Sequence, residues 1–464
     1  MDNKLRQLTH DFIDTYYDVI QPDILTGKPI EFITPEIQEE IKGIEFTEEG
    51  HNTEEMFNVL TEKVMQHRNK VEHPRNFTFI PGPAREESRL ASMVTDYYNC
   101  NACSHYLSSG AVLAEQQVIQ FLCEQAGFPK SSSGIFVSGG SGANMGAAIA
   151  ARDSRLSLDE ITQATVYISN QAHYSVNKGI NIVGIPDHRI RRVETDDAFK
   201  IIPEKLEEMI LEDIDNGYKP FMVTATAGTT NAGVIDPLSE IGDIAEKYNL
   251  WFHVDGAFGA TVLLSKTHRH LLEGISKADS LTWDGHKWLF QTYSCAMLLV
   301  KDRRHLLNSF CHTPEYLADA QKEEQVNPWD ISFELSHPSR GIKLWFTLVT
   351  LGTQKISDLI DRGFENGEWV QEIVESKPYW EIITPAQLGV INFRYYQEDK
   401  TLEELNQINA DLSEKMNESG YAHIVTTQLD DKIVLRIVAL SPETTKEDIE
   451  TCMQMFDQWI EEIK

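Results

Sequence analysis

Hydrophobic residues along the chain follow two rhythms, which divide it into regions of different structure. Near the start, Leu5, Leu8, Phe12 and Tyr16 recur at steps of three and four residues, the spacing of one face of an amphipathic helix. From about residue 110, short apolar or β-branched runs alternate with segments of helical period. The strand-like runs cover 134–137, 165–169, 221–225, 251–254 and 296–300, and the helical segments include 143–152, 202–215 and 238–248. This alternation predicts an α/β fold with a largely parallel sheet and helices on both faces.

Beyond about residue 344 the alternation stops. A long helical segment leads to short strands near 390–395 and 432–438, with helices between and after them, which predicts a smaller α+β domain. A chain of 464 residues is too long for one core. We therefore expect an N-terminal helical segment (1–80), a large domain (81–345) and a C-terminal small domain (346–464). The apolar stripe of the first helix must be buried somewhere, and a partner subunit is one candidate.

Charge and targeting signals narrow the class of protein. The formal net charge of −31 argues against binding to nucleic acid, which requires a basic surface, and against an anionic membrane surface. The first residues lack the apolar core of a signal peptide, and no stretch is long and apolar enough to span a bilayer. We therefore expect a cytoplasmic protein. Six cysteines in such a chain do not predict a disulfide framework.

The stretch 278–300 carries the sharpest chemical signal. Lys287 lies between a histidine and a tryptophan, and the apolar run 295–300 that follows is typical of a buried strand. A lysine held among apolar rings loses part of its preference for the charged form and can form a Schiff base with a carbonyl. Taken alone, Lys287 is also compatible with an ordinary surface lysine.

An acidic residue at the end of a strand supplies a second signal. Asp255 ends the apolar run at 251–254, where a lone carboxylate is costly without a positive partner. A protonated pyridine nitrogen would be such a partner, and enzymes that use a Schiff-base lysine provide an aspartate for it. A capping or metal-binding aspartate is the alternative. No second ligand stands at a usual zinc spacing, so we expect no metal.

Three further stretches could complete a binding site. A glycine-rich turn at 137–144 follows a strand and opens a helix, whose free backbone amides suit a phosphate. It has neither the P-loop nor the dinucleotide pattern. His173, in 172–178, could stack on an aromatic ring, although a buried core histidine gives the same pattern. The segment 224–233 is rich in hydroxyls and small residues and ends a strand, where ligands of open α/β sheets bind.

Together these motifs resemble the group II pyridoxal-phosphate amino-acid decarboxylases. That family includes the aromatic L-amino-acid, tyrosine, histidine and glutamate decarboxylases, and the resemblance runs from about His73 to Trp345. It rests on the glycine-rich turn, His173, Asp255 with Ala257, and the Asp-x-His-Lys-Trp motif that contains Lys287. The resemblance implies the pyridoxal-phosphate-dependent transferase fold (fold type I), with a mostly parallel seven-stranded sheet in the large, cofactor-binding domain. It also implies a homodimer with sites at the interface, in which the N-terminal segment packs.

The resemblance assigns a role to each matching residue. Lys287 would carry pyridoxal 5'-phosphate as a Schiff base, and Asp255 would keep the ring nitrogen protonated. Ala257 and His173 would pack on opposite ring faces, and His173 is also expected to be catalytic. The remaining cofactor-binding candidates are Gly140, Ser141 and His286 at the phosphate, Thr230 near the cofactor, and Asp284 as a polar anchor. Tyr316, in a stretch that looks like the family's active-site loop, is the candidate proton donor. Arg340 lies in a stretch that resembles a family motif, and its role stays open.

The resemblance also suggests a substrate class. Ile80, Gly82 and Tyr106 match positions that line the substrate pocket, and apolar or small groups there favour an aromatic side chain over a charged one. The central region is most similar to bacterial aromatic-amino-acid decarboxylases. We therefore expect decarboxylation of phenylalanine, tyrosine, tryptophan or hydroxylated relatives to the amine and CO2. Decarboxylation of acidic or diamino acids, aldehyde-forming oxidative deamination, sulfur-amino-acid cleavage and a catalytically silent binding protein are the alternatives.

Overall fold

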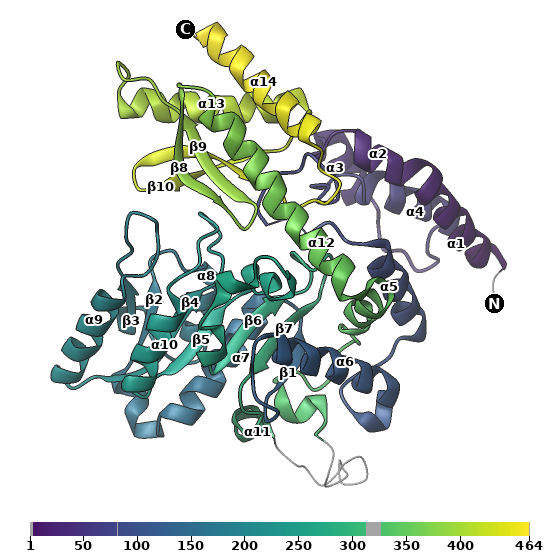
Figure 1. Ribbon diagram of the computed structural model, residues 1–464. Coiled ribbons are helices and arrows are strands. Elements are labelled where there is room, and N and C mark those ends of the chain that lie inside the picture. Colours follow the sequence, from purple (N-terminus) through teal and green to yellow (C-terminus); the bar gives the residue numbers. More distant parts are fainter. Residues whose placement is uncertain (1–2, 81, 312–325, 464) are drawn as a thin grey trace. The chain divides into compact units, whose positions relative to one another are not determined.

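The computed structural model describes residues 3–80, 82–311 and 326–463 (Figure 1). The chain divides into two compact units. The larger unit consists of residues 82–368 and 384–392, and the smaller consists of 1–81, 369–383 and 393–464. The domain boundaries near residues 80 and 345, which the sequence suggests, stay a prediction. In the described part of the chain, no helix is both long and apolar enough to cross a membrane.

The larger unit is built on a seven-stranded sheet. Its strands are β1 (Ser133–Val137), β2 (Ala164–Ser169), β3 (Ile190–Val193), β4 (Lys219–Thr226), β5 (Trp251–Asp255), β6 (Ser280–Asp284) and β7 (Ala296–Val300). They lie in the order β1-β7-β6-β5-β4-β2-β3. All pairs from β3 to β6 are parallel, whereas β7 runs antiparallel to both of its neighbours. The mostly parallel sheet expected from the sequence is therefore confirmed.

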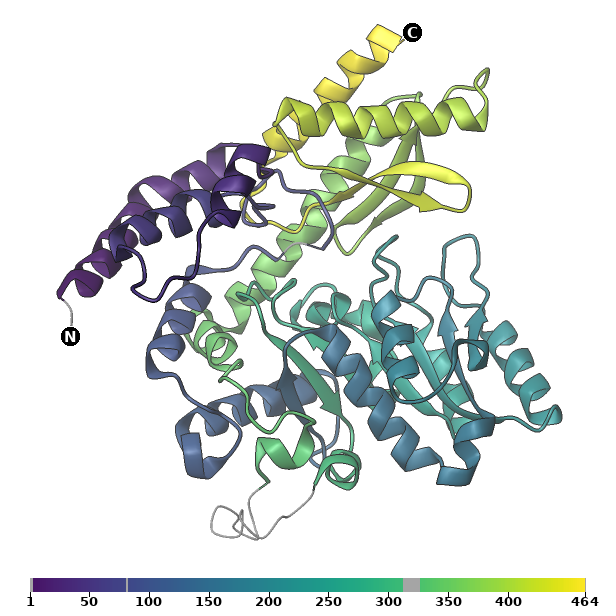
Figure 2. The ribbon, with the colours of Figure 1, turned by 180° about the vertical axis from the view of Figure 1, so that it is seen from behind.

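Helices pack on both faces of this sheet. The helices of the larger unit are α5 (Glu86–Tyr98), α6 (His105–Gln125), α7 (Gly140–Arg155), α8 (Tyr174–Ile182), α9 (Pro203–Asp215), α10 (Leu238–Lys247), α11 (Arg304–Phe310) and the first part of α12 (Ile342–Glu375). Figure 1 shows α10 in front of the strands, and Figure 2 shows α7 on the opposite face. This is the doubly covered arrangement that a parallel sheet requires, because both of its faces are apolar.

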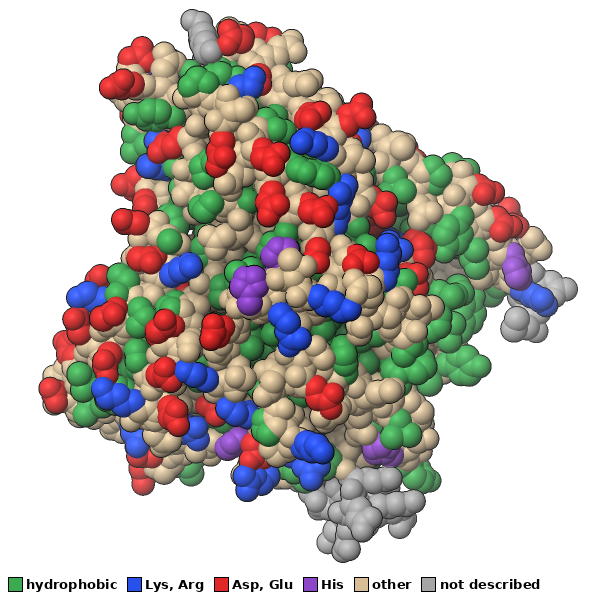
Figure 3. Space-filling model, viewed as in Figure 1, with side chains coloured by type: hydrophobic (Ala, Val, Ile, Leu, Met, Phe, Trp, Pro, Cys, Tyr) green, Lys and Arg blue, Asp and Glu red, His purple; other side chains and the backbone are tan. Residues whose placement is uncertain are grey.

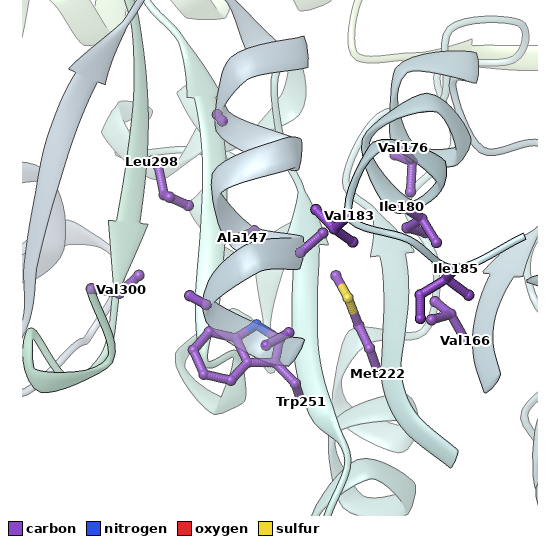
Figure 4. Packing of buried hydrophobic residues seen from close by; sticks show 14 of the residues in the cluster. Ala147, Val166, Val176, Ile180, Val183, Ile185, Met222, Trp251, Leu298 and Val300 are labelled. Atoms are coloured by element: carbon purple, nitrogen blue, oxygen red, sulfur yellow. The ribbon is translucent and has the colours of Figure 1, made fainter. Parts of the chain in front are cut away.

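The core against α7 explains how this helix is held. Alanines make up most of its buried side, including Ala143, Ala147 and Ala151, so the helix axis comes close to the sheet. Large side chains from the strands, among them Trp251 and Met222, fill the space beside it (Figure 4). Close packing of this kind leaves little freedom for the helix to shift. It therefore fixes the N-terminus of α7 at the end of β1.

The smaller unit contains the N-terminal helices and most of a second sheet. Its helices are α1 (Asn3–Thr15), α2 (Gln21–Thr26), α3 (Pro35–Lys42), α4 (Thr53–Asn58), α13 (Leu402–Ser419) and α14 (Lys446–Ile463). The four-stranded sheet has the order β10-β11-β9-β8, from β8 (Trp380–Gln387), β9 (Val390–Tyr395), β10 (Val425–Leu429) and β11 (Lys432–Val438). Within this unit, helix α13 begins with a capping box between Thr401 and Glu404. The α+β character expected for the C-terminal region is confirmed.

A buried acid in α6 makes stability depend on pH. Glu115 is fully enclosed and accepts a hydrogen bond of 2.7 Å from the backbone N–H of Gly341, and burial raises its pKa to about 8. The folded protein then holds a proton that the unfolded chain releases above pH ~4.5. Raising the pH from 4.5 to 8 should therefore cost up to ~4 kcal/mol of unfolding free energy.

Glu115→Gln should remove this dependence, because the amide stays neutral at every pH. The measurement is urea unfolding at pH 5 and pH 8. Glu124→Gln, an exposed position on the same helix, should leave the slope of the wild type unchanged. An equal slope in wild type and Glu115→Gln would contradict the prediction.

Candidate active site

The larger unit contains a cavity of about 220 Å³ at the ends of its central strands. The carboxyl ends of β1, β4, β5 and β6 meet there, because Val137 and Asp284 both pair with Ala296 and Asp255 pairs with Thr226 and Thr282. The cavity is lined by Gly139, Gly140, Ser141, His173, Ser175, Thr226, Gly228, Thr230, Asp255, Ala257, Phe258, Asp284, His286 and Lys287. Side chains from distant parts of the chain thus face one small space.

Lys287 provides an amine at this cavity. Its Nζ lies 3.3 Å from Oδ2 of Asp284, at the end of β6, and its side chain is about a quarter exposed. His286 Nε2 lies 3.6 Å from the same oxygen. The other carboxylate oxygen, Asp284 Oδ1, is buried and has no hydrogen-bond partner in the part of the chain that the structure describes. Burial lowers the pKa of His286 although Asp284 raises it, so the ring is neutral at pH 7. A buried acceptor without a donor is costly, which marks Asp284 as a residue prepared for a ligand.

Asp255 provides a carboxylate at the end of β5. It is 4% exposed. Its Oδ1 accepts a hydrogen bond of 3.1 Å from the backbone N–H of Ala257, and its Oδ2 accepts one of 3.0 Å from Asn144. These two donors fix the plane of the carboxylate. A buried carboxylate held in this way can stabilise a positive group placed opposite it in the cavity.

His173 forms another wall and also caps a helix. Its Nδ1 accepts a hydrogen bond of 3.3 Å from the backbone N–H of Ser175 at the start of α8, and lies 2.8 Å from Ser175 Oγ. Burial lowers the pKa of His173, while the charge of Asp255 raises it. The imidazole is therefore neutral at pH 7 and is suited to packing against a flat, apolar ring face.

The start of α7 supplies an anion site at one side of the cavity. Gly140 and Ser141 open a helix of 16 residues, whose first backbone amides have no partner within the helix. A Cβ on Gly140 would come within 3.0 Å of Asp284 Oδ2 and 3.4 Å of the Ala257 side chain. A side chain at this position would be tight against Asp284 and Ala257, whereas glycine leaves the amides open to a phosphate.

The sequence identified most of this lining. All nine residues proposed for the cofactor, from Gly140 to Lys287, line the same cavity. Thr226, Gly228, Gly139 and Phe258 were missed as individual residues, and Ser175 was included only within the stretch 172–178. The first two lie in the hydroxyl-rich stretch 224–233 that was expected to form a wall, so closer attention to that stretch could have found them. Phe258 carries no such signal beyond being next to Ala257.

The residues proposed for catalysis and substrate outside this cavity are more scattered. Tyr316 lies outside the described residues. Ile80 is half-buried and belongs to the smaller unit, whereas Tyr106 is 74% exposed in α6. Arg340 forms an ion pair of 2.5 Å with Glu334. Gly82 packs directly against the backbone of Lys287.

Gly82 should be sensitive to the smallest substitution. A Cβ there would overlap the backbone carbonyl oxygens of Lys287 and His286, so either Gly82 or the lysine segment must move. Gly82→Ala should lower the unfolding free energy by ~1–3 kcal/mol and reduce kcat about tenfold through displacement of Lys287. Thermal unfolding and initial rates measure both effects. Gly110→Ala, where a Cβ meets nothing within 4 Å, should show neither, and equal behaviour of the two variants would contradict the prediction.

The fold and the site together define a fold type I enzyme that depends on pyridoxal phosphate. Among solved structures, the chain is similar to Oryza sativa TDC with PLP and tryptamine, with a TM-score of 0.92 at 23% identity, covering 100% of this chain and 99% of that one. This likeness shows the fold. The model of the pyridoxal-dependent decarboxylase conserved domain matches residues 35–396, and the chain belongs to this family.

Curated relatives agree with the family over almost the whole chain. The aromatic-L-amino-acid decarboxylase of Bacillus atrophaeus is 34% identical over 464 residues, which covers 99% of this chain and 96% of the relative. Tyrosine decarboxylase 2 of Arabidopsis thaliana is 28% identical, covering 99% and 87%. An acidic amino acid decarboxylase of Mus musculus (29%, covering 95% and 83%) and the 4-hydroxyphenylacetaldehyde synthase of Rhodiola rosea (26%, covering 98% and 94%) are also similar. The protein is therefore a carboxy-lyase with pyridoxal phosphate as its cofactor.

The cavity fits this cofactor on its own evidence. It offers one amine (Lys287), two buried carboxylates (Asp255 and Asp284), two neutral imidazoles (His173 and His286) and the open amides of a helix start. Two buried oxygens of its lining, Asp284 Oδ1 and Thr226 Oγ1, have no hydrogen-bond partner among the described residues. A ligand with an aldehyde, a ring nitrogen, a hydroxyl and a phosphate can meet each of these groups.

Proposed function

We propose that the protein decarboxylates aromatic L-amino acids to the amine and CO2. The observation that carries the proposal is the presence of Lys287 and Asp255 in one cavity beside an anion site at the start of α7. The aromatic preference is supported by the 34% identical relative from Bacillus atrophaeus and by the similarity to a tyrosine decarboxylase.

Each group of the cofactor has a candidate partner among the cavity residues. Gly140, Ser141 and His286 would hold the phosphate, aided by the positive end of the α7 dipole. Lys287 would bind the aldehyde covalently, and Asp284 and Thr230 would hold the polar ring substituents. When bound, the cofactor supplies a conjugated ring that accepts the electron pair released as the substrate's carboxylate leaves as CO2.

The chain's own residues would control charge and protons around that ring. Asp255 would keep a proton on the ring nitrogen. Its carboxylate is buried and fixed by two hydrogen bonds, so it would stabilise the protonated nitrogen more strongly than bulk water does. Neutral His173 would pack on one face of the ring and Ala257 on the other. Tyr316, outside the described residues, remains our candidate to protonate the substrate carbon after CO2 departs.

The substrate side chain would contact Ile80, Gly82 and Tyr106. Small and apolar groups at these positions favour an aromatic ring over a carboxylate. Two alternatives have support from relatives: decarboxylation of acidic amino acids and aldehyde formation. Both would keep the same cofactor site and differ in the groups around the substrate.

A product panel tests the proposal. The purified enzyme with pyridoxal phosphate is given single amino acids from the aromatic, acidic and diamino classes, and amine, CO2, aldehyde, ammonia and peroxide are measured. We expect amine and CO2 in equal amounts, fastest with an aromatic substrate. Aldehyde with ammonia and peroxide would support oxidative deamination instead. Faster turnover of glutamate, aspartate or a diamino acid would overturn the aromatic assignment.

We also propose a homodimer located in the cytoplasm. Helix α5 exposes an apolar stripe at helical spacing, formed by Leu90, Met93, Val94, Tyr97 and Tyr98, of which the two tyrosines are 70% and 78% exposed. Figure 3 shows hydrophobic side chains gathered over this helix. An apolar stripe of this length on a helix surface is typical of a surface that another chain covers.

A charge placed in this stripe should weaken the dimer. Val94→Glu would bury a carboxylate against apolar groups, at a cost of ~2 kcal/mol or more. Sedimentation over a range of concentrations should show a dimer for the wild type and a raised dissociation constant for the variant. Leu158→Glu, at an 87% exposed site away from the stripe, should behave as wild type. A wild-type monomer at every concentration would refute the dimer.

A further inference from the structure

A buried asparagine behind the cavity joins the two groups that face the cofactor ring. Asn144, in the first turns of α7, is 3% exposed and is not among the residues that line the cavity. Its Nδ2 donates to Asp255 Oδ2 and to Ser175 Oγ, both at 3.0 Å. Its Oδ1 accepts from Thr282 Oγ1 at 2.7 Å and lies 3.0 Å from His253 Nε2. Both N–H bonds and both lone pairs of this amide are therefore used.

The direction of these hydrogen bonds follows from groups that can only accept or only donate. Asp255 Oδ2 can only accept when the carboxylate is ionised, so the nitrogen of Asn144 faces it and the oxygen faces His253. That oxygen can only accept, so His253 carries its proton on Nε2. His253 is fully buried, and burial lowers its pKa to about 4, which leaves this ring neutral with a single N–H.

The chain of hydrogen bonds extends beyond His253 on one side and beyond Asn144 on the other, and the donor and acceptor of each further bond follow from those already assigned. On the far side, Trp251 Nε1–H donates to Ser280 Oγ at 2.8 Å, and the Ser280 hydroxyl donates to His253 Nδ1 at 2.8 Å. On the near side, Ser175 Oγ receives the Asn144 N–H, so its own hydrogen is free to donate to His173 Nδ1 at 2.8 Å. The backbone N–H of Ser175 also donates to this nitrogen. Both contacts require His173 Nδ1 to be an acceptor.

We infer that Asn144 is a positioning residue that holds Asp255 and, through Ser175, the ring of His173. The same chain of hydrogen bonds keeps the single ring proton of His173 on Nε2. Nε2–H is then the donor that His173 can offer to a ligand. The charged groups around the ring are Asp255, Lys287 and Asp284. The inference rests on the proposed roles of Asp255 and His173 in the cofactor site.

The proton position can be measured without any turnover. Nitrogen-15 spectra of the histidine rings are recorded on the full-length protein at pH 7.5, with and without pyridoxal phosphate, and the His173 signals are assigned as those lost in His173→Phe. We expect Nδ1 of His173 to have the shift of an unprotonated nitrogen and Nε2 that of a protonated one. A proton on Nδ1, or on both nitrogens, would overturn the inference, whatever the substrate is.

A second experiment tests the positioning role. Asn144→Leu keeps the branched shape at a somewhat larger volume and removes all four hydrogen bonds. The value of kcat should therefore fall ~10- to 100-fold while KM changes less than twofold, because neither Asp255 nor His173 is proposed to bind the substrate side chain. The affinity for pyridoxal phosphate, measured by fluorescence, should fall as well. Asn177→Leu, in α8 beside Asn181 and Asp187, is the matched control and should behave as wild type.

Two outcomes of this experiment decide against Asn144. A folded Asn144→Leu with wild-type kcat and cofactor affinity would refute the positioning role. If Asn144→Leu does not fold, Thr282→Val removes one donor to Asn144 Oδ1 at constant shape, and an unchanged kcat in that variant would refute it equally. Rates are measured on whichever amino acid the wild type decarboxylates, so failure of the aromatic assignment leaves this test intact.

Discussion

Lys287→Ala should lose at least ~10³-fold in kcat/KM and should no longer bind pyridoxal phosphate covalently. Among the described residues that line the cavity, Lys287 is the only lysine, and its Nζ is held 3.3 Å from Asp284 Oδ2. Removal of this amine leaves the cofactor's aldehyde without its partner. After loading with the cofactor and reduction with borohydride, the wild-type peptide that contains residue 287 should gain the mass of the reduced cofactor. The variant peptide should not.

Two further variants distinguish loss of the amine nucleophile from loss of positive charge at residue 287 and from the effect of removing any lysine. Lys287→Arg keeps a positive group beside Asp284, but a guanidinium stays protonated and cannot act as the nucleophile, so the same loss is expected. Lys205→Ala, at an exposed ion pair with Glu208 on α9, should keep full activity and the mass gain. Borohydride labelling at another lysine, or an active Lys287→Arg, would show that residue 287 does not bear the cofactor.

Topology explains why the cofactor-binding residues proposed from the sequence line one cavity. Asp255 and Lys287 stand 32 residues apart, yet the parallel pairing of β5 with β6 brings the carboxyl ends of both strands to one edge. Any residue that follows a strand in such a sheet is directed to that edge. The alternation of strands and helices therefore directed Gly140 and Asp255 to this edge, whereas Lys287, whose preceding strand β6 was not predicted, was assigned to the site by the resemblance of its motif.

Two strands of the large sheet, β3 and β6, were missed because their residues do not look like a buried strand. β6, with the sequence Ser-Leu-Thr-Trp-Asp, is buried along its whole length although Ser280, Thr282 and Asp284 are polar. Their side chains are hydrogen-bonded to, or face, other polar groups, and such pairing depends on residues far away in sequence. β3 carries Arg191 and Arg192 and lies at the sheet edge, where Arg191 pairs with Asp213. Periodicity cannot reveal burial that is made tolerable by a distant partner.

Asn144 illustrates the same limit at the site. In the sequence it is one polar residue in a glycine-rich helix start, where asparagine most often serves the helix itself. Its actual partners come from β5, β6 and α8, on segments up to 138 residues away. A residue that acts through others in this way is visible only after the sheet has assembled. The residues that touch the cavity were therefore predictable, whereas those that orient them were not.

Asp255→Asn should reduce kcat by ~10²- to 10³-fold with little change in fold, because it removes a preorganised charge at nearly constant shape. The substitution also replaces one carboxylate oxygen by a donor. Since the backbone N–H of Ala257 and the amide of Asn144 both donate to this carboxylate, one of them must then face another donor. The ring nitrogen of the cofactor would lose the group that keeps its proton in place. The effect should therefore exceed that of Gly82→Ala or Asn144→Leu.

The measurement separates loss of charge at the ring from loss of structure. The rate of CO2 release and the affinity for pyridoxal phosphate should both fall in Asp255→Asn, while its thermal unfolding midpoint stays within a few degrees of the wild type. Asp243→Asn, which breaks an exposed ion pair with Lys277 in the same unit, should keep the wild-type rate. If Asp255→Asn retains more than about a tenth of the activity, an ionised carboxylate at this position is not needed for decarboxylation. Another group of the cavity would then have to hold the ring nitrogen, and the role of Asn144 in positioning Asp255 would not be needed for catalysis.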